Sequence, residues 1–416
     1  PRDLIANLGV HDGRVFGFAG SGLYRFDAAA QGFVPGSDPG SEAEALYTRY
    51  LRNVKVDANG DVYVGTWGNG LYRLRGSAET LWKAQAPSCL QQAFPGDPWT
   101  VVPALAPPRE NDLYFTVFNT EGSATHQLAH LNTSTGAVTC LDNDAEGGYP
   151  HAVLALADTL VAVATERGIS LVTVSEGVAG PVFQSSALWT LAGAANETWD
   201  LAVDGFGRPW ALTGDQLVFL DSIAESTTRR LKPIDNFTGS GCKSLEADPQ
   251  GLLWVGCDNG LFRVQTGLDG SVTAVLPYRA DDGMAGSMVY DLAMDPVTGR
   301  LWVATDRGVS MFESPAQPPR ARGDLAAIVP YPNPYRGDHR ARGVPVVFRD
   351  MPPDATLRIH DPSGTVLRVL APAQRRGNQF QWDGRNNAGR EVKPGVYLFS
   401  VTAGGKVERG KVIVAP

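Results

Sequence analysis

The sequence predicts an all-β protein: a seven-bladed β-propeller followed by a small β-sandwich. Three observations predict this fold. A short hydrophobic run with an aromatic or aliphatic centre returns seven times, at intervals of 44 to 51 residues. Glycine and proline number 47 and 29, as expected where many tight turns join short strands. The repeat ends near residue 316, and the spacing of the hydrophobic runs changes after it.

The seven runs give the expected blades in order. Self-similarity at a period of roughly 40–50 residues, in short β-type runs, is the sequence signature of a propeller. In the clearest copies, residues 54–74, 245–264 and 292–312, an aliphatic run ends in Asp, a Gly turn follows, and an aromatic strand comes next. The seven centres are Phe16, Tyr63, Tyr114, Val161, Trp210, Trp254 and Trp302. We therefore expect residues 1–316 to form the propeller.

Four copies carry an Asp at the start of a turn: Asp57, Asp204, Asp248 and Asp295. An Asp in this place accepts backbone N–H bonds and initiates the turn, which is the favoured interpretation over a metal ligand. The aromatic centres are expected to be blade core, since large aromatic side chains dominate the energetics of cores.

The loops between the expected blades carry the candidate ligand-binding residues. Connections from the outer strand of one blade to the inner strand of the next converge on one face, where aromatic and carboxylate side chains suit a carbohydrate, peptide or protein ligand. The alternative is that several of them, especially Trp99 and Trp199, fill gaps between blades. The candidates are Tyr47, Tyr50, Phe94, Trp99, Tyr149, His151, Trp189, Trp199, Phe237, Tyr278, Asp281 and Asp282.

The four cysteines favour an oxidising, exported location. Cys242 and Cys257 flank an expected hairpin with its turn at residues 249–251, and symmetric pairing places them close enough for a disulfide. Cys89 and Cys140 would form a second disulfide. The alternative is two buried free thiols.

A second domain is expected after residue 316. Residues 317–327 are expected to be a Pro-rich, extended linker, and residues 328–416 a separate unit. Short alternating strands over about 90 residues, with turn signals between them, argue for a small β-sandwich. The strand candidates are residues 344–348, 355–361, 365–371, 378–382, 395–401 and 410–414.

The repeat resembles the two-component-regulator propeller repeat. Residues 278–312 are similar to it nearly end to end, with an Asp-Gly-Met segment, a strand ending in Asp, then Leu-Trp-Val-Ala-Thr, Gly and a further strand. Members of that family are sensor ectodomains of histidine kinases and other exported proteins of the Bacteroidota and their relatives. The resemblance implies an exported propeller, and no particular ligand.

Residues 328–416 resemble the C-terminal sorting domain of type IX secretion cargo and the related Ig-like domain of the flagellar hook-capping protein. The matching motif residues are Pro332, Asn333, Pro334, Trp382, Asp383, Gly384, Gly395, Tyr397 and Lys411. This resemblance implies an Ig-like sandwich and export across the outer membrane, followed by cleavage and anchoring or by retention at the cell surface.

Charge divides the chain. The net charge is −8, but residues 320–416 hold 16 Lys and Arg against 8 Asp and Glu, which leaves 20 basic and 36 acidic residues before them. The asymmetry suggests different partners for the two parts, or mutual attraction between them; the alternative is two unrelated solvated surfaces. No stretch of about 18 apolar residues exists, so no transmembrane segment is expected, and no nucleic-acid partner is indicated.

These features favour a non-enzymatic, exported binding or structural protein of the cell surface. We expect the basic C-terminal domain to dock to the type IX secretion or attachment machinery, or to anionic lipopolysaccharide. The alternatives are a component of that machinery, a self-assembling surface-layer or filament subunit, and a secreted polysaccharide hydrolase or lyase. The enzyme would depend on Asp97, Asp144, Glu146, His151, Glu197, Asp281 or Asp282 converging at the axis.

No cofactor and no metal site is expected. Residues 142–147 are similar to the start of a calcium loop, but the twelfth position is Val153 where a bidentate Glu is needed. His126 and His130 lie in a β-like segment without a zinc motif, and we expect them to be ordinary surface or edge residues.

Overall fold

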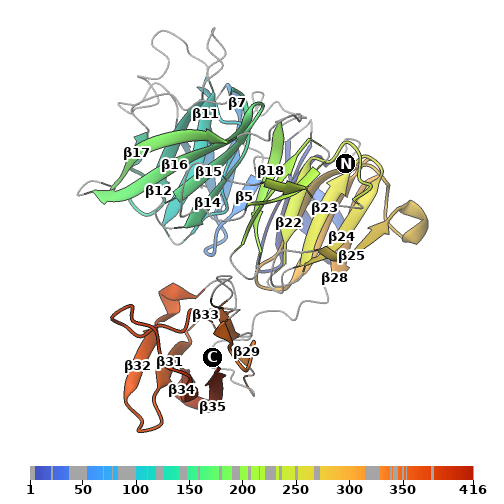
Figure 1. The fold of residues 1–416 in the computed structure, drawn as a ribbon. Coiled ribbons are helices and arrows are strands. Elements are labelled where there is room, and N and C mark those ends of the chain that lie inside the picture. Colours follow the sequence, from blue (N-terminus) through green and yellow to red (C-terminus); the bar gives the residue numbers. More distant parts are fainter. Residues whose placement is uncertain are drawn as a thin grey trace.

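The protein is all-β in the computed structural model (Figure 1). Two groups of sheets follow each other along the chain, the first within residues 7–313 and the second within residues 330–414. The structure describes residues 5–19, 22–36, 54–68, 70–76, 78–82, 100–109, 111–118, 126–140, 148–157, 160–177, 180–189, 197–204, 208–214, 216–220, 231–233, 237–248, 252–266, 272–313, 328, 330–337, 340, 345–348, 351–352, 354–375 and 379–415.

The first group, called the ring below, consists of antiparallel meanders in which strands close in sequence lie side by side. Its sheets have the orders β1-β2-β3-β4, β5-β6-β8-β9, β7-β10-β11-β12-β13, β14-β15-β16-β17, β18-β19-β20-β21, β22-β23-β24-β25 and β26-β27-β28. The strands are β1 (Asn7–His11), β2 (Arg14–Ala19), β3 (Gly22–Asp27), β4 (Gly32–Pro35), β5 (Val54–Val56), β6 (Val62–Gly65), β7 (Trp67–Gly68), β8 (Leu71–Arg75), β9 (Ala78–Trp82), β10 (Thr100–Val101), β11 (Asp112–Phe118), β12 (His126–Asn132), β13 (Val138–Cys140), β14 (Pro150–Ala157), β15 (Leu160–Thr165), β16 (Gly168–Gly177), β17 (Gly180–Trp189), β18 (Thr198–Val203), β19 (Pro209–Thr213), β20 (Gln216–Leu220), β21 (Leu231–Pro233), β22 (Ser244–Ala247), β23 (Leu252–Cys257), β24 (Gly260–Thr266), β25 (Val272–Tyr278), β26 (Val289–Met294), β27 (Arg300–Thr305) and β28 (Gly308–Glu313).

The first strands of successive sheets contact one another around the ring. β14 lies beside β18, β18 beside β22 and β22 beside β26, and β1 contacts both β5 and β26. The first and last sheets therefore meet, as a propeller requires, and their side chains share one core cluster that includes Leu8, Val15, Ala293 and Trp302.

Six of the seven repeat centres occupy one structural position, the second strand of their sheet, and the seventh, Tyr114, lies on β11, the middle strand of a five-stranded sheet. Tyr63, Trp210 and Trp254 are almost fully buried. The prediction that the aromatic centres are blade core is confirmed for these residues. Phe16 and Tyr114 are half-buried and pack against the clusters of neighbouring strands.

The turn-forming role predicted for the four Asp residues is confirmed. Asp57 accepts the N–H of Asn59 and Asp61 at 2.9 Å, and Asp248 accepts that of Leu252 at 2.9 Å. Asp204 does more, because its second oxygen also accepts the indole N–H of Trp210 at 3.0 Å. The turn and the aromatic strand after it are thus joined by one carboxylate.

His130 corrects the sequence interpretation of the two histidines. It is 3% exposed, and its Nε2 lies 2.7 Å from a carboxylate oxygen of Asp112 across the β11–β12 pair. It is a satisfied core residue and not a surface one. Of His126 the structure describes only the backbone.

The second group of sheets forms a unit with its own core. A short sheet has the order β29-β30-β33 and a longer one, called the C-terminal sheet below, has the order β32-β31-β34-β35. Their strands are β29 (Pro330–Tyr331), β30 (Val346–Phe348), β31 (Thr356–His360), β32 (Val366–Leu370), β33 (Phe380–Trp382), β34 (Gly395–Ala403) and β35 (Lys406–Val414). The core cluster contains Trp382, Phe348 and Phe399, and it draws on no described residue of the ring. The linker predicted at residues 317–327 lies outside the described residues.

Candidate functional site

A strip of partly exposed aromatic side chains crosses three sheets at one end of their strands. The ring of Phe118, at the end of β11, lies 4.9 Å from that of Tyr149, just before β14. Tyr149 lies 5.3 Å from His151, and His151 lies 4.3 Å from Trp199 near the start of β18. Phe118, Tyr149, His151 and Trp199 are called the aromatic strip below. All four are half-buried, so they offer ring surface to solvent while being held by their neighbours.

A cation continues the strip onto the next sheet. Lys243 precedes β22, is exposed, and places its ammonium group 5.1 Å from the centre of the Trp199 ring. A cation within about 6 Å of an aromatic face is attracted by the ring's electrons. The strip therefore ends in a positive charge that a ligand on the Trp199 ring would meet.

Two carboxylates lie beside the strip. Glu197 has an oxygen 3.3 Å from Nε2 of His151, and Glu166 accepts the backbone N–H of Tyr149 at 3.3 Å. Burial and the nearby charge of Glu166 raise the pKa of Glu197, although Lys243 opposes them. Burial raises the pKa of Tyr149 as well, so its phenol stays neutral and can donate a hydrogen bond. The site combines ring faces, one cation and a carboxyl group that retains its proton more readily than usual.

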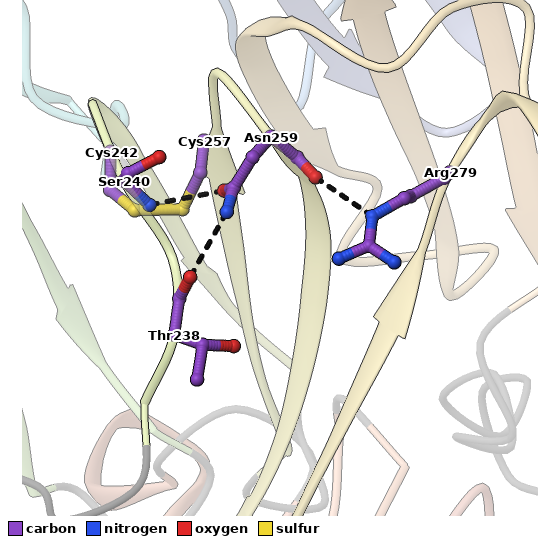
Figure 2. The surroundings of a disulfide bond; sticks show 6 residues. All are labelled: Thr238, Ser240, Cys242, Cys257, Asn259 and Arg279. Atoms are coloured by element: carbon purple, nitrogen blue, oxygen red, sulfur yellow. Dashed lines mark hydrogen bonds between the residues drawn. A yellow bond between two sulfur atoms is a disulfide. The ribbon is translucent and has the colours of Figure 1, made fainter.

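The disulfide predicted between Cys242 and Cys257 is confirmed (Figure 2). Lys243 directly follows Cys242 in the sequence. Gly239 packs against it so closely that a Cβ there would lie 2.6 Å from both sulfur atoms. Asn259 holds the same loop by accepting the N–H of Ser240 and donating to the carbonyl of Thr238, each at 3.0 Å (Figure 2). The disulfide and Asn259 therefore both hold the loop that leads to Lys243.

Cys140 is disulfide-bonded too. Its predicted partner, Cys89, lies outside the described residues.

Three predicted ligand-face residues are in the strip, and others have different places. Tyr149, His151 and Trp199 are brought together. Phe237 packs 5.2 Å from Phe262 in a cluster that two neighbouring sheets share, and Tyr278 on β25 packs 5.5 Å from Phe312 on β28 of the next sheet, so both lie between blades. This outcome corresponds to the gap-filling alternative, and the half-buried Trp199 also packs against the same cluster as Phe237.

Asp281 and Asp282 lie apart from the strip. They belong to the 3₁₀ turn η2 (Ala280–Asp282), where Asp282 accepts the backbone N–H of Arg279 at 2.9 Å. Both are exposed. No contact joins them to the aromatic strip among the residues that the structure describes.

The remaining candidates lie outside the described residues, or only their backbone is described. Trp189 ends β17, and its side chain is not described. The candidates outside the described residues are Tyr47, Tyr50, Phe94, Trp99, Asp97, Asp144 and Glu146. In the described part of the chain, no three His, Cys, Asp or Glu side chains are grouped so as to hold a metal ion. No helix in the described ranges is long and apolar enough to cross a membrane.

Sequence reasoning missed Phe118 and Lys243. Phe118 closes the segment Asp112–Phe118, which reads only as a degenerate repeat copy. Lys243 directly follows Cys242 and lies just before β22, the first strand of its sheet. Trp199 lies at the start of β18, which is also a first strand, and this equivalence of position was the available signal.

The motif residues of the C-terminal unit hold it together. Asn333 accepts the N–H of Ile413 at 2.9 Å, within the motif Pro332, Asn333 and Pro334, whose Asn333–Pro334 peptide is cis. Trp382 is fully buried and donates its indole N–H to the carbonyl of Arg385 at 2.9 Å.

The rest of the motif is also structural, apart from Lys411. Asp383 accepts the N–H of Arg385 at 3.0 Å, and Tyr397 donates its hydroxyl to the carbonyl of Lys393 at 2.6 Å. Gly384 has a φ of 75° and lies where a Cβ would come within 2.8 Å of a neighbouring ring. Gly395 starts β34, opposite Val414, and Lys411 is exposed on β35.

One family model matches the C-terminal part of the chain. The family model of the FlgD Ig-like domain matches residues 344–406. No curated protein matches.

Solved structures are similar in fold at low identity. PorZ, an essential bacterial surface component of the type-IX secretion system of Porphyromonas gingivalis, is 17% identical with a TM-score of 0.52, over 97% of this chain and 56% of PorZ. The extracellular domain of BT4673 from B. thetaiotaomicron, assigned to a hybrid two-component system, is 15% identical with a TM-score of 0.53, over 98% of this chain and 50% of that one. Virginiamycin B lyase from Staphylococcus aureus is 11% identical with a TM-score of 0.53, over 74% of this chain and 94% of the lyase.

The likenesses to solved structures show a β-propeller-like fold, and the family match shows an Ig-like domain. The chain spans about half the length of PorZ and of the BT4673 ectodomain.

Proposed function

We propose that this protein is an exported, non-enzymatic binding protein of a type IX-secreting bacterium, and that its ring is a seven-bladed propeller that binds a ligand on the face of the aromatic strip. The observation that carries this proposal is the continuity of the strip from Phe118 to Trp199, ended by Lys243. Partly exposed aromatic rings with one convergent charge are what a specific binding site needs.

The C-terminal unit would serve export and anchoring. Its motif residues and the match to the FlgD Ig-like domain support this role, as does the likeness to PorZ in fold. The proposed partners are the type IX secretion or attachment machinery and anionic lipopolysaccharide. The proposed limits are residues 1–316 for the propeller and 328–416 for this unit, joined by residues 317–327.

Binding is tested with the full chain on arrays of bacterial glycans and peptides. Trp199→Ala and Lys243→Ala should each weaken binding of the recognised ligand by at least about tenfold, because truncating an anchor residue of an interface costs about 1.4 kcal/mol or more of binding free energy. Arg300→Ala is the matched control, because Arg300 is an exposed cation at the start of β27, at the opposite end of the strands. Equal weakening by the control, or a ligand indifferent to Trp199, would refute the proposed face.

Export and anchoring are tested on the native protein. Surface labelling of cells followed by intact-mass measurement should find the protein outside the outer membrane. A surface chain that still ends at Pro416 assigns the C-terminal unit a lasting task, whereas a chain ending near residue 320 makes it a removable export signal. A protein protected from surface label would contradict the proposed location.

A polysaccharide-cleaving enzyme is the second candidate, and one observation favours it. Glu197, whose pKa is raised, lies 3.3 Å from the imidazole of His151, as an acid–base pair would. Product release from a panel of anionic and neutral polysaccharides, abolished by Glu197→Gln with binding retained, would establish it.

A further inference from the structure

The outer face of the C-terminal sheet exposes apolar side chains. Val396 and Leu398 on β34 and Val407 on β35 are 47%, 44% and 43% exposed, and Val366, opposite His360 in the register, is 43% exposed. These four are among the nine most exposed large apolar side chains of the described residues. Their concentration on one sheet face, out of the whole described chain, is typical of an interaction surface.

A groove runs along this face between β31, β34 and β35. Its volume is about 780 Å³, and its lining includes His360, Leu398, Ser400, Val407, Arg409 and Lys411. It is apolar along its floor, and its charged lining residues are basic. No Asp or Glu of the described residues lines it.

The positive charges of the groove lie along β35. Arg409 and Lys411 are exposed and alternate with residues that face the core, such as Val412. No described carboxylate pairs with either of them, whereas Arg340 and Arg385 of the same unit both pair with Glu391. Two cations left without acidic partners beside an apolar groove select for a negatively charged occupant.

Part of the edge of β35 is already covered. Ile413 donates its N–H to Asn333 at 2.9 Å and accepts the N–H of Tyr335 at 2.7 Å, while Lys411 offers its carbonyl to Asn333 at 3.3 Å. Ala415 donates to the carbonyl of Tyr335 at 2.7 Å. The outward-facing backbone groups of β35 are therefore those of odd-numbered residues, and their last members are capped.

The capping stops short of the middle of the strand. Since successive residues of a strand alternate in direction, Val407 and Arg409 also point their N–H and C=O groups away from β34. Among the described residues, nothing bonds to these backbone groups. The result is an open strand edge of a few residues, lying directly beside the apolar and basic groove.

We propose that this open stretch of β35 and the groove beside it bind an extended, acidic polypeptide segment, which adds to the C-terminal sheet as a fifth strand. An added strand lies about 4.8 Å from its neighbour and gains main-chain hydrogen bonds, while alternate side chains enter adjacent pockets. Acidic side chains on its groove side would meet Arg409 and Lys411, and apolar ones would cover Val407 and Leu398.

A second copy of this chain fits the edge poorly. β35 carries Lys406, Arg409 and Lys411 against the single acid Glu408. Pairing two such strands would place like charges opposite or diagonal to each other, which is destabilising. The charge of the strand thus favours an acidic partner over self-pairing.

The experiment uses the full chain and fluorescein-labelled ten-residue peptides that alternate Thr with Glu, with Lys substituted for Glu as the charge control. A third peptide carries Pro at its centre, which removes a ladder hydrogen bond. We expect the Glu peptide to bind in anisotropy titrations and to slow hydrogen exchange at the amides of Val407, Arg409 and Lys411. The Lys and Pro peptides should bind at least about tenfold more weakly.

Matched variants locate the site. Arg409→Glu should weaken binding of the Glu peptide at least about tenfold. Arg390→Glu makes the same charge change in the turn that contacts β32, the opposite edge of the sheet, and should leave binding within about twofold. Val407→Pro, which removes one outward N–H, should weaken binding without changing the charge.

Several results would overturn the proposal. These are no binding of the Glu peptide, equal binding of the Lys peptide, equal weakening by Arg409→Glu and Arg390→Glu, or protection of other amides only. Dimerisation of the chain through β35, detected by sedimentation and lost in Val407→Pro, would assign the edge to a second copy instead. Because none of these readouts involves the aromatic strip, failure here leaves the proposed ligand face untouched.

Discussion

The carboxylate of Asp291 accepts a buried hydrogen bond of 2.8 Å from the backbone N–H of Leu8, 283 residues earlier in the chain. The same pattern occurs at the two preceding junctions. Asp200 accepts the N–H of Leu245 at 2.8 Å, and Ser244 accepts that of Leu292 at 3.0 Å. In each case a first-strand side chain binds the backbone of the next sheet, so the ring is closed by the same device that joins its blades.

The first prediction concerns this closure. Asp291→Ala leaves the N–H of Leu8 buried without its acceptor, which costs about 1–3 kcal/mol. We expect a lower midpoint in chemical denaturation of the ring. Asp27→Ala is the control, because Asp27 accepts the N–H groups of Ala29 and Ala30 in an exposed turn, and its effect should be clearly smaller. Equal losses for the two variants would show that the junction bond does not contribute.

A second contact between the first and last sheets predicts that the stability of the fold depends on pH. Asp295 accepts the N–H groups of Asp12 at 3.0 Å and Gly13 at 2.7 Å. Burial alone would raise its pKa, but the hydrogen bonds from Thr298, Gly13 and Val297 outweigh burial and lower the pKa. An Asp with a lowered pKa stabilises the fold above its unfolded pKa of about 3.9, and this stability is lost as the pH falls through the folded value.

The measurement is the unfolding free energy of the native protein and Asp295→Asn from pH 7 to pH 2. The native protein should lose stability below about pH 4 more steeply than the variant. Parallel curves would contradict the prediction.

The sequence predicts the fold better than it predicts the site, and the residues show why. The repeat reports what happens inside a blade, so the burial of Trp254 and the turn at Asp57 follow from local spacing. Asp200 and Asp291 act between blades, and nothing in the spacing identifies the backbone group that each meets. Trp199 and Lys243 likewise come from different sheets, and only the ring brings them within 5.1 Å.

The third prediction concerns the disulfide beside the ligand face. The bond joins residues 15 positions apart, and closing a loop of about 15 residues stabilises by about 3 kcal/mol. The double variant Cys242→Ser/Cys257→Ser should have a lower thermal midpoint of unfolding. It should also bind the ligand recognised by Trp199 more weakly, because the loop that carries Lys243 is loosened. A reductant should lower the midpoint of the native protein by more than that of the variant, in which the disulfide of Cys140 remains to be reduced. An unchanged midpoint would contradict the role of the bond.

The fourth prediction tests the independence of the C-terminal unit. A Cβ at Gly410 would collide with the ring of Phe399, which lies in the core of that unit alone. Gly410→Val should therefore cost at least about 1–3 kcal/mol. In calorimetry we expect one transition to move down and the transition of the ring to stay. A common shift of both transitions would mean that the two cores unfold together.

The last prediction concerns Glu246, in the first strand β22 of its sheet. Burial raises its pKa to about 8; Lys55 opposes this, and the charges of Asp200 and Asp291 add to it. A carboxyl group with a raised folded pKa stabilises the fold fully below its unfolded pKa of about 4.3, and this stability is lost as the pH rises towards the folded value. The native protein should therefore become less stable between about pH 5 and pH 8. Glu246→Gln, which stays neutral, should remove this loss of stability with rising pH. The loss of stability in acid that depends on Asp295 should remain. A slope that persists in the variant would show that another group titrates in this range.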